Sequence, residues 1–198
     1  MKRSPNVERA DIDTRAAAPA KRTMSLRAPS SLYAKSGAVI DLSRMLDEFR
    51  EAAERVGLLS HAVVLTPEHL AAPHRPPSRL QPHSTAVYVF SLSAAYGATV
   101  PAGPNRVIKV GKVGTNSAAR FCSQHYLPHS AGSNVAKSLL TERVLWPYLG
   151  IQELDERSVK AWMCEHLDRD HIFIAGQPGL ERDVERYFRG RLGPVFEG

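Results

Sequence analysis

Two short runs rich in β-branched residues lie close together in the middle of the chain. They are AVYVFSLS, residues 86–93, and RVIKVGKV, residues 106–113, and a loop rich in glycine and proline separates them. Runs of this kind favour extended strands, and a loop of this kind favours reversal of the chain. Together they predict a β-hairpin, so the fold is expected to be built on an antiparallel sheet.

Five segments after the hairpin have the pattern of regular structure. Three predict helices, one short apolar run predicts a strand, and the last predicts a further helix. The helices are expected from about Asn116, from about Ser133 to Pro147 and from about Ser158, the strand over 171–176 and the last helix over 179–192. This order predicts an α/β (α+β) domain over residues 85–198, with a small central antiparallel three-stranded sheet flanked by helices.

Residues 39–60 contain one amphipathic helix. Apolar residues recur at three- and four-residue spacing from Leu42 to Val56, which places their side chains on one helical face. Asp41 is of a type that caps the first turn, and Gly57 of the type that ends a helix. The apolar face is expected to pack on the main domain or on a partner.

Two other segments have no regular period. Residues 61–84 contain five prolines and predict a Pro-rich linker. Residues 1–38, rich in Ala, Arg, Ser and Pro, predict a disordered basic tail, because they lack the apolar residues that would offset the entropy of ordering. Eight basic and three acidic residues give this tail +5 of the formal net charge of +6. The tail would either tether nucleic acid loosely or keep the protein in solution.

A second concentration of positive charge lies inside the predicted domain. Residues 101–150 contain six lysines and arginines and a single acidic residue, Glu142. This excess predicts a basic face that would attract a phosphate backbone.

The chain has no apolar run of about 18 residues and begins with a polar segment. We therefore expect a cytoplasmic protein without a membrane partner. Its two cysteines, Cys122 and Cys164, are too few for a disulfide framework and are expected to be thiols.

The hairpin and the helix after it carry residues in the order found in the GIY-YIG nuclease superfamily. Tyr88 in AVYVF corresponds to the tyrosine of the first motif, and Gly111 in IKVGKV to the glycine of the second. Lys109 stands where many members have a second tyrosine, so the chain resembles a lysine variant of the family. Arg120, nine residues past Gly111, lies close to the position of the family's helix arginine.

Two further positions of the family pattern can be placed in this sequence. His125 or Tyr126 lies near the family's histidine or tyrosine. Glu185, nine residues before Pro194, corresponds to the metal-binding glutamate, with Glu181 as the competing candidate one turn earlier. Glu197 stands where the family has an asparagine.

The resemblance implies a metal-dependent endonuclease that acts on nucleic acid, with DNA favoured over RNA. Tyr88 would be the general base or would relay a proton, and Lys109 would favour its phenolate. Arg120 would offer a planar set of donors to the phosphate, and Glu185 would hold one Mg²⁺ or Mn²⁺. His125 or Tyr126 would assist proton transfer or orient the water.

Other interpretations stay open for the same residues. Glu185 could simply pair with Arg182 or Arg189 on its own helix. The scaffold could be a catalytically inactive module that binds nucleic acid or another protein. The cysteines and histidines Cys122, His125, His129, Cys164 and His166 could in principle form a zinc site, but their spacing matches no standard zinc pattern. The two cysteines are better explained as small core residues on helices.

Overall fold

The computed structural model describes residues 40–196 apart from 116, 131 and 133. The predicted tail over residues 1–38 and the expected asparagine position, Glu197, lie outside the described residues. So do Asn116 and Ser133, where two helices were expected to begin.

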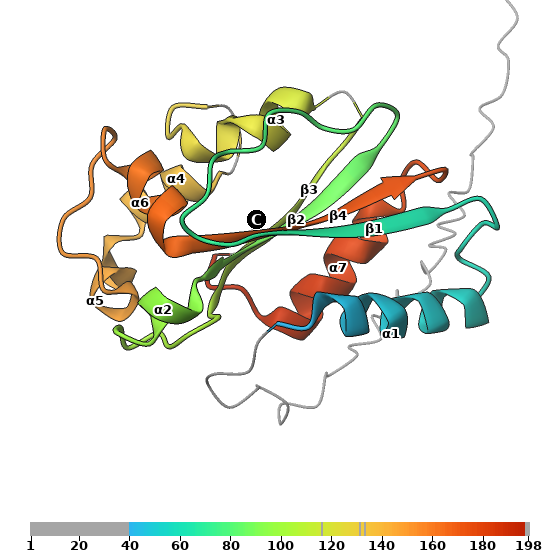
Figure 1. Cartoon of the computed structure of the whole chain (residues 1–198), viewed down its shortest axis with the longest axis horizontal. Coiled ribbons are helices and arrows are strands. Elements are labelled where there is room, and N and C mark those ends of the chain that lie inside the picture. Colours follow the sequence, from blue (N-terminus) through green and yellow to red (C-terminus); the bar gives the residue numbers. More distant parts are fainter. Residues whose placement is uncertain (1–39, 116, 131, 133, 197–198) are drawn as a thin grey trace, which may run out of the picture. The chain divides into compact units, whose positions relative to one another are not determined.

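Within the described residues, four strands form one antiparallel sheet in the order β1-β4-β2-β3. The strands are β1 (Val64–Leu70), β2 (Thr85–Leu92), β3 (Val107–Val113) and β4 (Leu167–Ala175). The predicted hairpin is confirmed as β2 and β3, and every residue of β2 is buried. Figure 1 shows the sheet nearly edge-on, between two groups of helices.

The expectation of three strands is wrong because β1 lies inside the segment predicted to be a linker. It pairs with β4 from Val64 opposite Ala175 to Leu70 opposite Arg169. Proline normally interrupts a sheet because it has no N–H to donate. An edge strand such as β1 forms backbone hydrogen bonds on one side only, so it tolerates Pro67. The parts of the predicted linker outside a strand are therefore residues 61–63 and 71–84.

β4 begins four residues before the predicted strand. Its first residues, Leu167 to Asp170, include three charged side chains, of which Arg169 and Asp170 are buried. Charged residues are rare in buried strands, so the sequence pattern shows only the apolar second half of β4.

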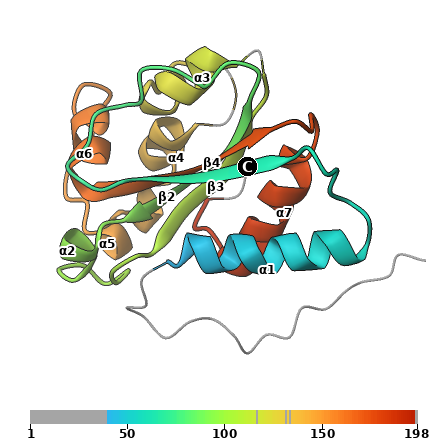
Figure 2. The same ribbon diagram turned by 45° about the vertical axis from the view of Figure 1, so that its right-hand side comes forward.

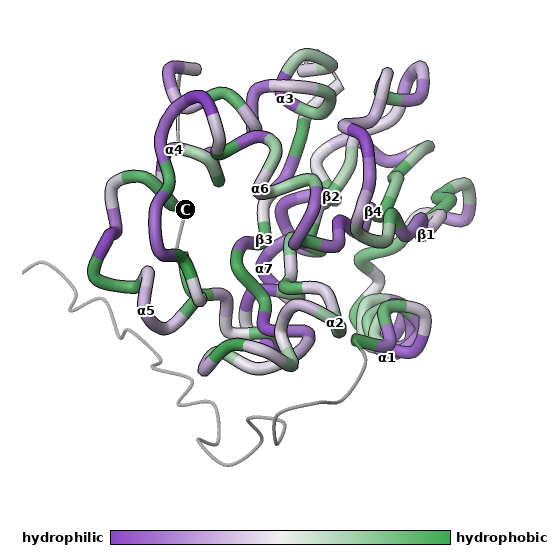
Figure 3. The backbone as a smooth tube through the Cα atoms, turned by 60° about the vertical axis from the view of Figure 1, so that its left-hand side comes forward, coloured by the Kyte–Doolittle hydropathy of each residue, from purple (hydrophilic) through white to green (hydrophobic). Residues whose placement is uncertain are grey.

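Two helices cover one face of the sheet, α1 (Leu42–Arg55) and α7 (Glu181–Leu192) (Figure 1). The predicted amphipathic helix is confirmed over the shorter range Leu42–Arg55. The Asp41 side chain accepts a hydrogen bond from the Arg44 N–H at 2.9 Å, and Gly57 follows the helix with a φ of 66°. Figure 3 looks almost along α1 and shows hydrophobic and hydrophilic residues on different sides of it. Its apolar face joins the core formed with β2, β3, β4 and α7, so α1 packs within its own chain.

The other face of the sheet is covered by shorter helices (Figure 2). These are α3 (Ala118–Cys122), α4 (Val135–Thr141) and α6 (Val159–His166), with α2 (Ala94–Gly97) and α5 (Trp146–Leu149) near one end. The single helix expected up to Pro147 is in fact α4, a 3-10 turn (Arg143–Leu145) and α5. α5 starts afresh at Trp146 with Pro147 in its first turn, where a missing N–H costs little.

No helix in the described part of the chain is long and apolar enough to cross a membrane.

Candidate functional site

A cleft of about 410 Å³ lies along β3, with residues of α3 and α7 in its walls. The first half of β3 is covered on its outer edge, because Val195 and Phe196 donate backbone hydrogen bonds to the carbonyls of Val107 and Ile108. The second half, around Gly111, borders the cleft. Most of the side chains that face the cleft are polar or charged: Tyr88, Lys109, Lys112, Ser117, Arg120, Glu181, Arg182, Glu185 and Arg189.

The Tyr88 hydroxyl reaches the cleft over Gly111. The two residues are directly opposite each other in the β2–β3 ladder. A Cβ atom on Gly111 would overlap the hydroxyl oxygen and Cζ of Tyr88, so the phenol can occupy this position only because residue 111 has no side chain. The ring itself is buried.

Arg120 of α3 is the cation that acts on this hydroxyl. Burial raises the pKa of Tyr88 above its ordinary value, and the charge of Arg120 and a hydrogen bond with it oppose that rise. The charge of Glu185 adds to the rise in the pKa of Tyr88, and the charge of Arg169 opposes it. The cations that counteract the effect of burial on the pKa of Tyr88 are Arg120 and Arg169. The expected role of Lys109 in favouring the phenolate stays a prediction.

Glu185 of α7 faces the cleft and forms an ion pair across to β3. Its Oε2 lies 2.6 Å from the Nζ of Lys112, and its side chain is 14 % exposed. The partner of Glu185 in this contact is thus a lysine of β3, and additional pairing with an arginine on its own helix stays an open interpretation. The carboxylate of Glu181 has a different partner. Its Oε2 accepts a hydrogen bond at 2.8 Å from the N–H of Gly179, which precedes α7. Both candidate carboxylates line the cleft, and Glu185 is the one that pairs with a cleft lysine.

Lys109 lies in the cleft wall and is buried. Burial lowers the pKa of its ammonium group, and the neighbouring charges of Arg189 and Arg120 lower it further, while Glu185 acts in the opposite direction. Lys109 is thus one member of a crowded group of cations, which favours an anionic ligand.

Neither His125 nor Tyr126 lines the cleft. His125 is fully buried behind Tyr88, with the two ring centroids 4.1 Å apart, and neither of its ring nitrogens has a hydrogen-bond partner among the described residues. Burial and the charge of Arg169 hold the pKa of His125 well below its usual value. His125 is therefore a neutral packing partner of Tyr88, and the predicted role in proton transfer or in orienting water does not fit its position.

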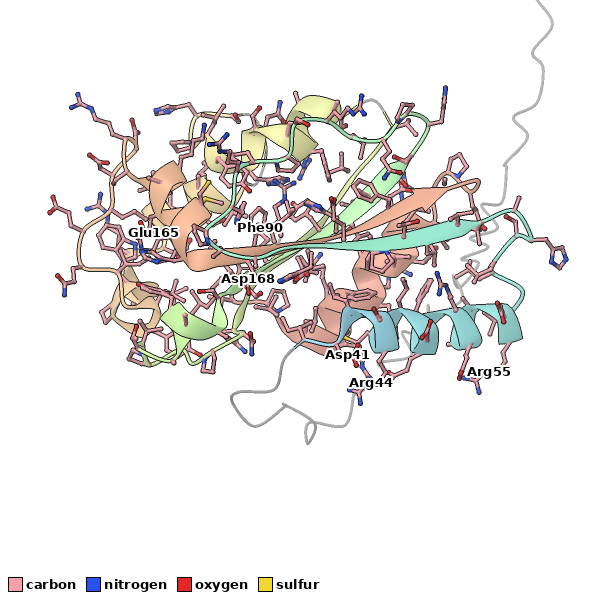
Figure 4. The ribbon with its side chains drawn as sticks, viewed as in Figure 1. Asp41, Arg44, Arg55, Phe90, Glu165 and Asp168 are labelled. Carbon is pink, nitrogen blue, oxygen red and sulfur yellow. The ribbon has the colours of Figure 1, made fainter. Side chains whose placement is uncertain are left out.

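Tyr126 points into the core toward Arg169. Its hydroxyl lies 2.9 Å from His74 Nε2 and accepts a hydrogen bond from Arg169 Nη1 at 3.2 Å. Arg169 is fully buried, has no carboxylate partner among the described residues, and lies over the rings of Phe90, Phe121 and Tyr126 at 5.0–5.6 Å. Figure 4 labels Phe90 on the sheet, beneath the helices that cover this side. This buried cation was not expected from the sequence, because it lies among charged residues at the start of β4.

Lys112, Arg182 and Arg189 are cleft residues that the sequence did not assign to the site. Lys112 directly follows Gly111 on β3, and side chains of neighbouring strand residues point to opposite faces. Lys112 points to the face of the sheet that α7 covers, and there it pairs with Glu185 of α7 at the cleft. Among the described residues of the cleft, five cationic side chains outnumber two carboxylates.

The alternative zinc ligands are not brought together. His125 packs on Tyr88, His129 lies 2.8 Å from Glu156, and His166 stacks on Tyr96. The described part of the chain contains no group of three or more His, Cys, Asp or Glu residues placed to hold a metal ion. Cys122 and Cys164 are free thiols on α3 and α6 that pack against the core, as predicted.

The cleft thus combines a phenol, a guanidinium group that hydrogen-bonds to it, a carboxylate and surplus positive charge. Groups of these kinds can bind a phosphate, neutralise charge on its oxygens and accept a proton. Comparison of the chain with protein-family models, with curated proteins and with solved structures gave no significant match.

Proposed function

We propose that this cleft hydrolyses phosphodiester bonds of nucleic acid, as a metal-dependent endonuclease of the GIY-YIG type acting on DNA in preference to RNA. The observation that carries the proposal is the convergence of Tyr88, Arg120 and Glu185 on one cleft. These residues come from β2, α3 and α7 and are separated by 32 and 65 positions in the sequence. Gly111 provides the space that this arrangement requires.

Each side chain has a role that its surroundings support. Arg120 would bind a non-bridging oxygen of the scissile phosphate. This interaction would become stronger as negative charge develops on the oxygen in the transition state. Tyr88 would accept a proton from the attacking water as the new P–O bond forms and the bond to the leaving oxygen breaks. Because burial raises the pKa of Tyr88, only a small fraction is phenolate at neutral pH, and the reaction would speed up as pH rises.

A divalent cation fits the carboxylate of Glu185. Mg²⁺ and Mn²⁺ are commonly held by one or two carboxylates, with water and substrate phosphate as the remaining ligands. Glu185 faces the cleft, and its partner Lys112 is 39 % exposed, so the lysine can swing aside. When bound there, such an ion would stabilise negative charge on the leaving oxygen.

The second candidate is a module on the same scaffold that binds nucleic acid and cuts nothing. The ion pair of Glu185 with Lys112 favours it, because the lysine competes with a metal ion for the same carboxylate. The surplus of cations in the cleft would still bind a phosphate backbone.

The test is cleavage of mixed DNA and RNA substrates by the full chain, with Mg²⁺, Mn²⁺ or chelator, for wild type, Arg120→Ala and Glu185→Gln. Arg44→Ala and Glu165→Gln are matched controls, because both residues are exposed and lie outside the cleft (Figure 4). Metal-dependent cleavage that is lost in the two cleft variants and kept in the two controls supports the nuclease. Binding in chelator without cleavage in any metal assigns the second candidate, and neither binding nor cleavage refutes both.

A further inference from the structure

Strand β1 forms one edge of the sheet, because among the described residues it pairs with β4 alone. Most of its side chains are exposed, and only Leu65 is fully buried. The backbone of an edge strand offers a row of donors and acceptors to which a strand of another molecule can add. Native proteins usually block such edges, and β1 has two features that do so.

The first feature is Arg50 of α1, the helix that runs alongside β1 in Figures 1 and 2. Its Nη2 donates a hydrogen bond to the Leu65 carbonyl at 2.8 Å, and its Nη1 lies 3.1 Å from Asp47 Oδ1. The guanidinium group is therefore fixed between a carboxylate of its own helix and the backbone of β1. An added strand would have to displace it to reach the Leu65 carbonyl.

The second feature is Pro67, which has no N–H to donate. In an antiparallel ladder, alternate residues direct their backbone groups toward the partner strand, and the residues between them direct theirs away. Leu65, Pro67 and His69 belong to one such set. The bond from Arg50 to the Leu65 carbonyl places this set on the outer edge, away from β4. The missing N–H of Pro67 thus falls on the side where another strand would pair.

A second copy of this chain would meet both features at once. If two β1 strands paired antiparallel about a twofold axis at Pro67, that proline would lie opposite itself and Leu65 opposite the partner's His69. Three outward pairs would form, with two hydrogen bonds in each. Both bonds of the central pair are lost at Pro67, and each outer pair loses the bond to the Leu65 carbonyl that Arg50 occupies. Two of the six bonds are left.

We propose that Arg50 and Pro67 together close the β1 edge, so that this sheet does not pair with the sheet of a second copy. The inference is independent of the proposed function, because neither residue lines the cleft. Substitution of either residue restores two bonds, and substitution of both restores all six. The two changes are therefore expected to act together.

The test is sedimentation velocity of the full chain in reducing buffer over a hundredfold range of protein concentration. Wild type is expected to stay monomeric, and Arg50→Ala/Pro67→Thr to increase in mass toward a dimer. Arg55→Ala/Pro67→Thr is the control, because Arg55 Nε donates to the Glu51 carbonyl of its own helix at 3.2 Å (Figure 4). The control is expected to associate about thirtyfold more weakly, since each of the two bonds that Arg50 blocks changes the equilibrium about fivefold. Equal association of the two double variants, or a monomer in both, overturns the inference.

Hydrogen exchange tests the same geometry in wild type and decides the matter if the double variant does not fold. The N–H groups of Leu65 and His69 are expected to exchange fast, and those of Thr66 and Glu68, which point to β4, slowly. Equal protection of all four in the wild-type monomer overturns the assignment of the outer edge. In the associated double variant, Leu65 and His69 are expected to become protected, and association that leaves them unprotected refutes pairing through β1.

Discussion

Acid is expected to destabilise this protein through His171, a buried histidine of β4. Its side chain is fully buried beside Phe121 and Phe173, with ring centroids 4.6 Å and 5.8 Å away. Burial lowers its pKa from 6.5 to about 2, and the charge of Arg169 contributes to the shift. The contact of Nδ1 with Glu68 Oε2 at 3.3 Å is therefore a hydrogen bond from a neutral ring.

The magnitude follows from the difference in proton binding between the two states. Below pH 6.5 the unfolded chain protonates His171 and the native protein does not, so the free energy of unfolding falls as pH falls through this window. Each pH unit costs about 1.4 kcal/mol for one such group. Between pH 7.5 and 4.5 the loss from His171 alone is about 2.7 kcal/mol, a large part of the 5–15 kcal/mol typical of a folded domain. His125, whose pKa is also lowered, adds to the loss.

Urea unfolding at pH 7.5, 6.5, 5.5 and 4.5 measures this effect, with His171→Gln as the variant that cannot titrate. The stability gap between wild type and variant is expected to shrink by about 2.7 kcal/mol over this range. His61→Gln is the control, because His61 is exposed. Parallel curves for wild type and His171→Gln would refute the reasoning. If the variant does not fold, NMR titration of wild type decides, since a His171 ring that titrates above pH 5 contradicts it.

Three further predictions concern the cleft. Gly111→Ala is expected to push the Tyr88 hydroxyl out of place, with loss of cleavage and a destabilisation of about 1–3 kcal/mol in urea unfolding. Gly114→Ala, where a Cβ meets nothing within 4 Å, is expected to leave the stability unchanged, and equal destabilisation by the two substitutions contradicts the packing described. The pKa of Tyr88 is raised above 10. For this reason kcat/KM of the proposed nuclease is expected to rise about tenfold per pH unit between pH 7 and 9. A flat pH profile would exclude Tyr88 as the base. Lys112→Gln is expected to tighten Mn²⁺ binding in calorimetry, because it removes the ion pair and frees the carboxylate of Glu185. The gain is at most about fivefold, since a partly exposed ion pair is worth at most about 1 kcal/mol. Unchanged or weaker binding would show that the lysine does not compete with the ion.

The sequence predicted those elements whose pattern is local. The strands of the hairpin, helix α1 with its cap at Asp41, and helix α7 were all expected close to their observed bounds. In each case the spacing of apolar residues and the capping or turn residues lie within one short segment. Such signals require no knowledge of what the segment packs against.

The sequence did not predict β1 or the first half of β4. Pro67 argues against a strand unless the segment is known to lie at an edge, and edge position is a property of the whole sheet. Arg169 and Asp170 argue against burial unless their partners are known. Asp170 lies 2.6 Å from His69 on β1, and Arg169 bonds to Tyr126, so both are held by residues distant in the sequence.

The same division holds for the candidate site. The sequence suggested Tyr88, Arg120 and Glu185 as candidates, because their order along the chain resembles that of a family motif. Only the tertiary structure decided that these three side chains share one cleft, that Lys112 pairs with Glu185, and that His125 and Tyr126 face the core instead. The physical reason is that the direction of a side chain follows from local backbone geometry, while its neighbours follow from how α3 and α7 pack on opposite faces of the sheet.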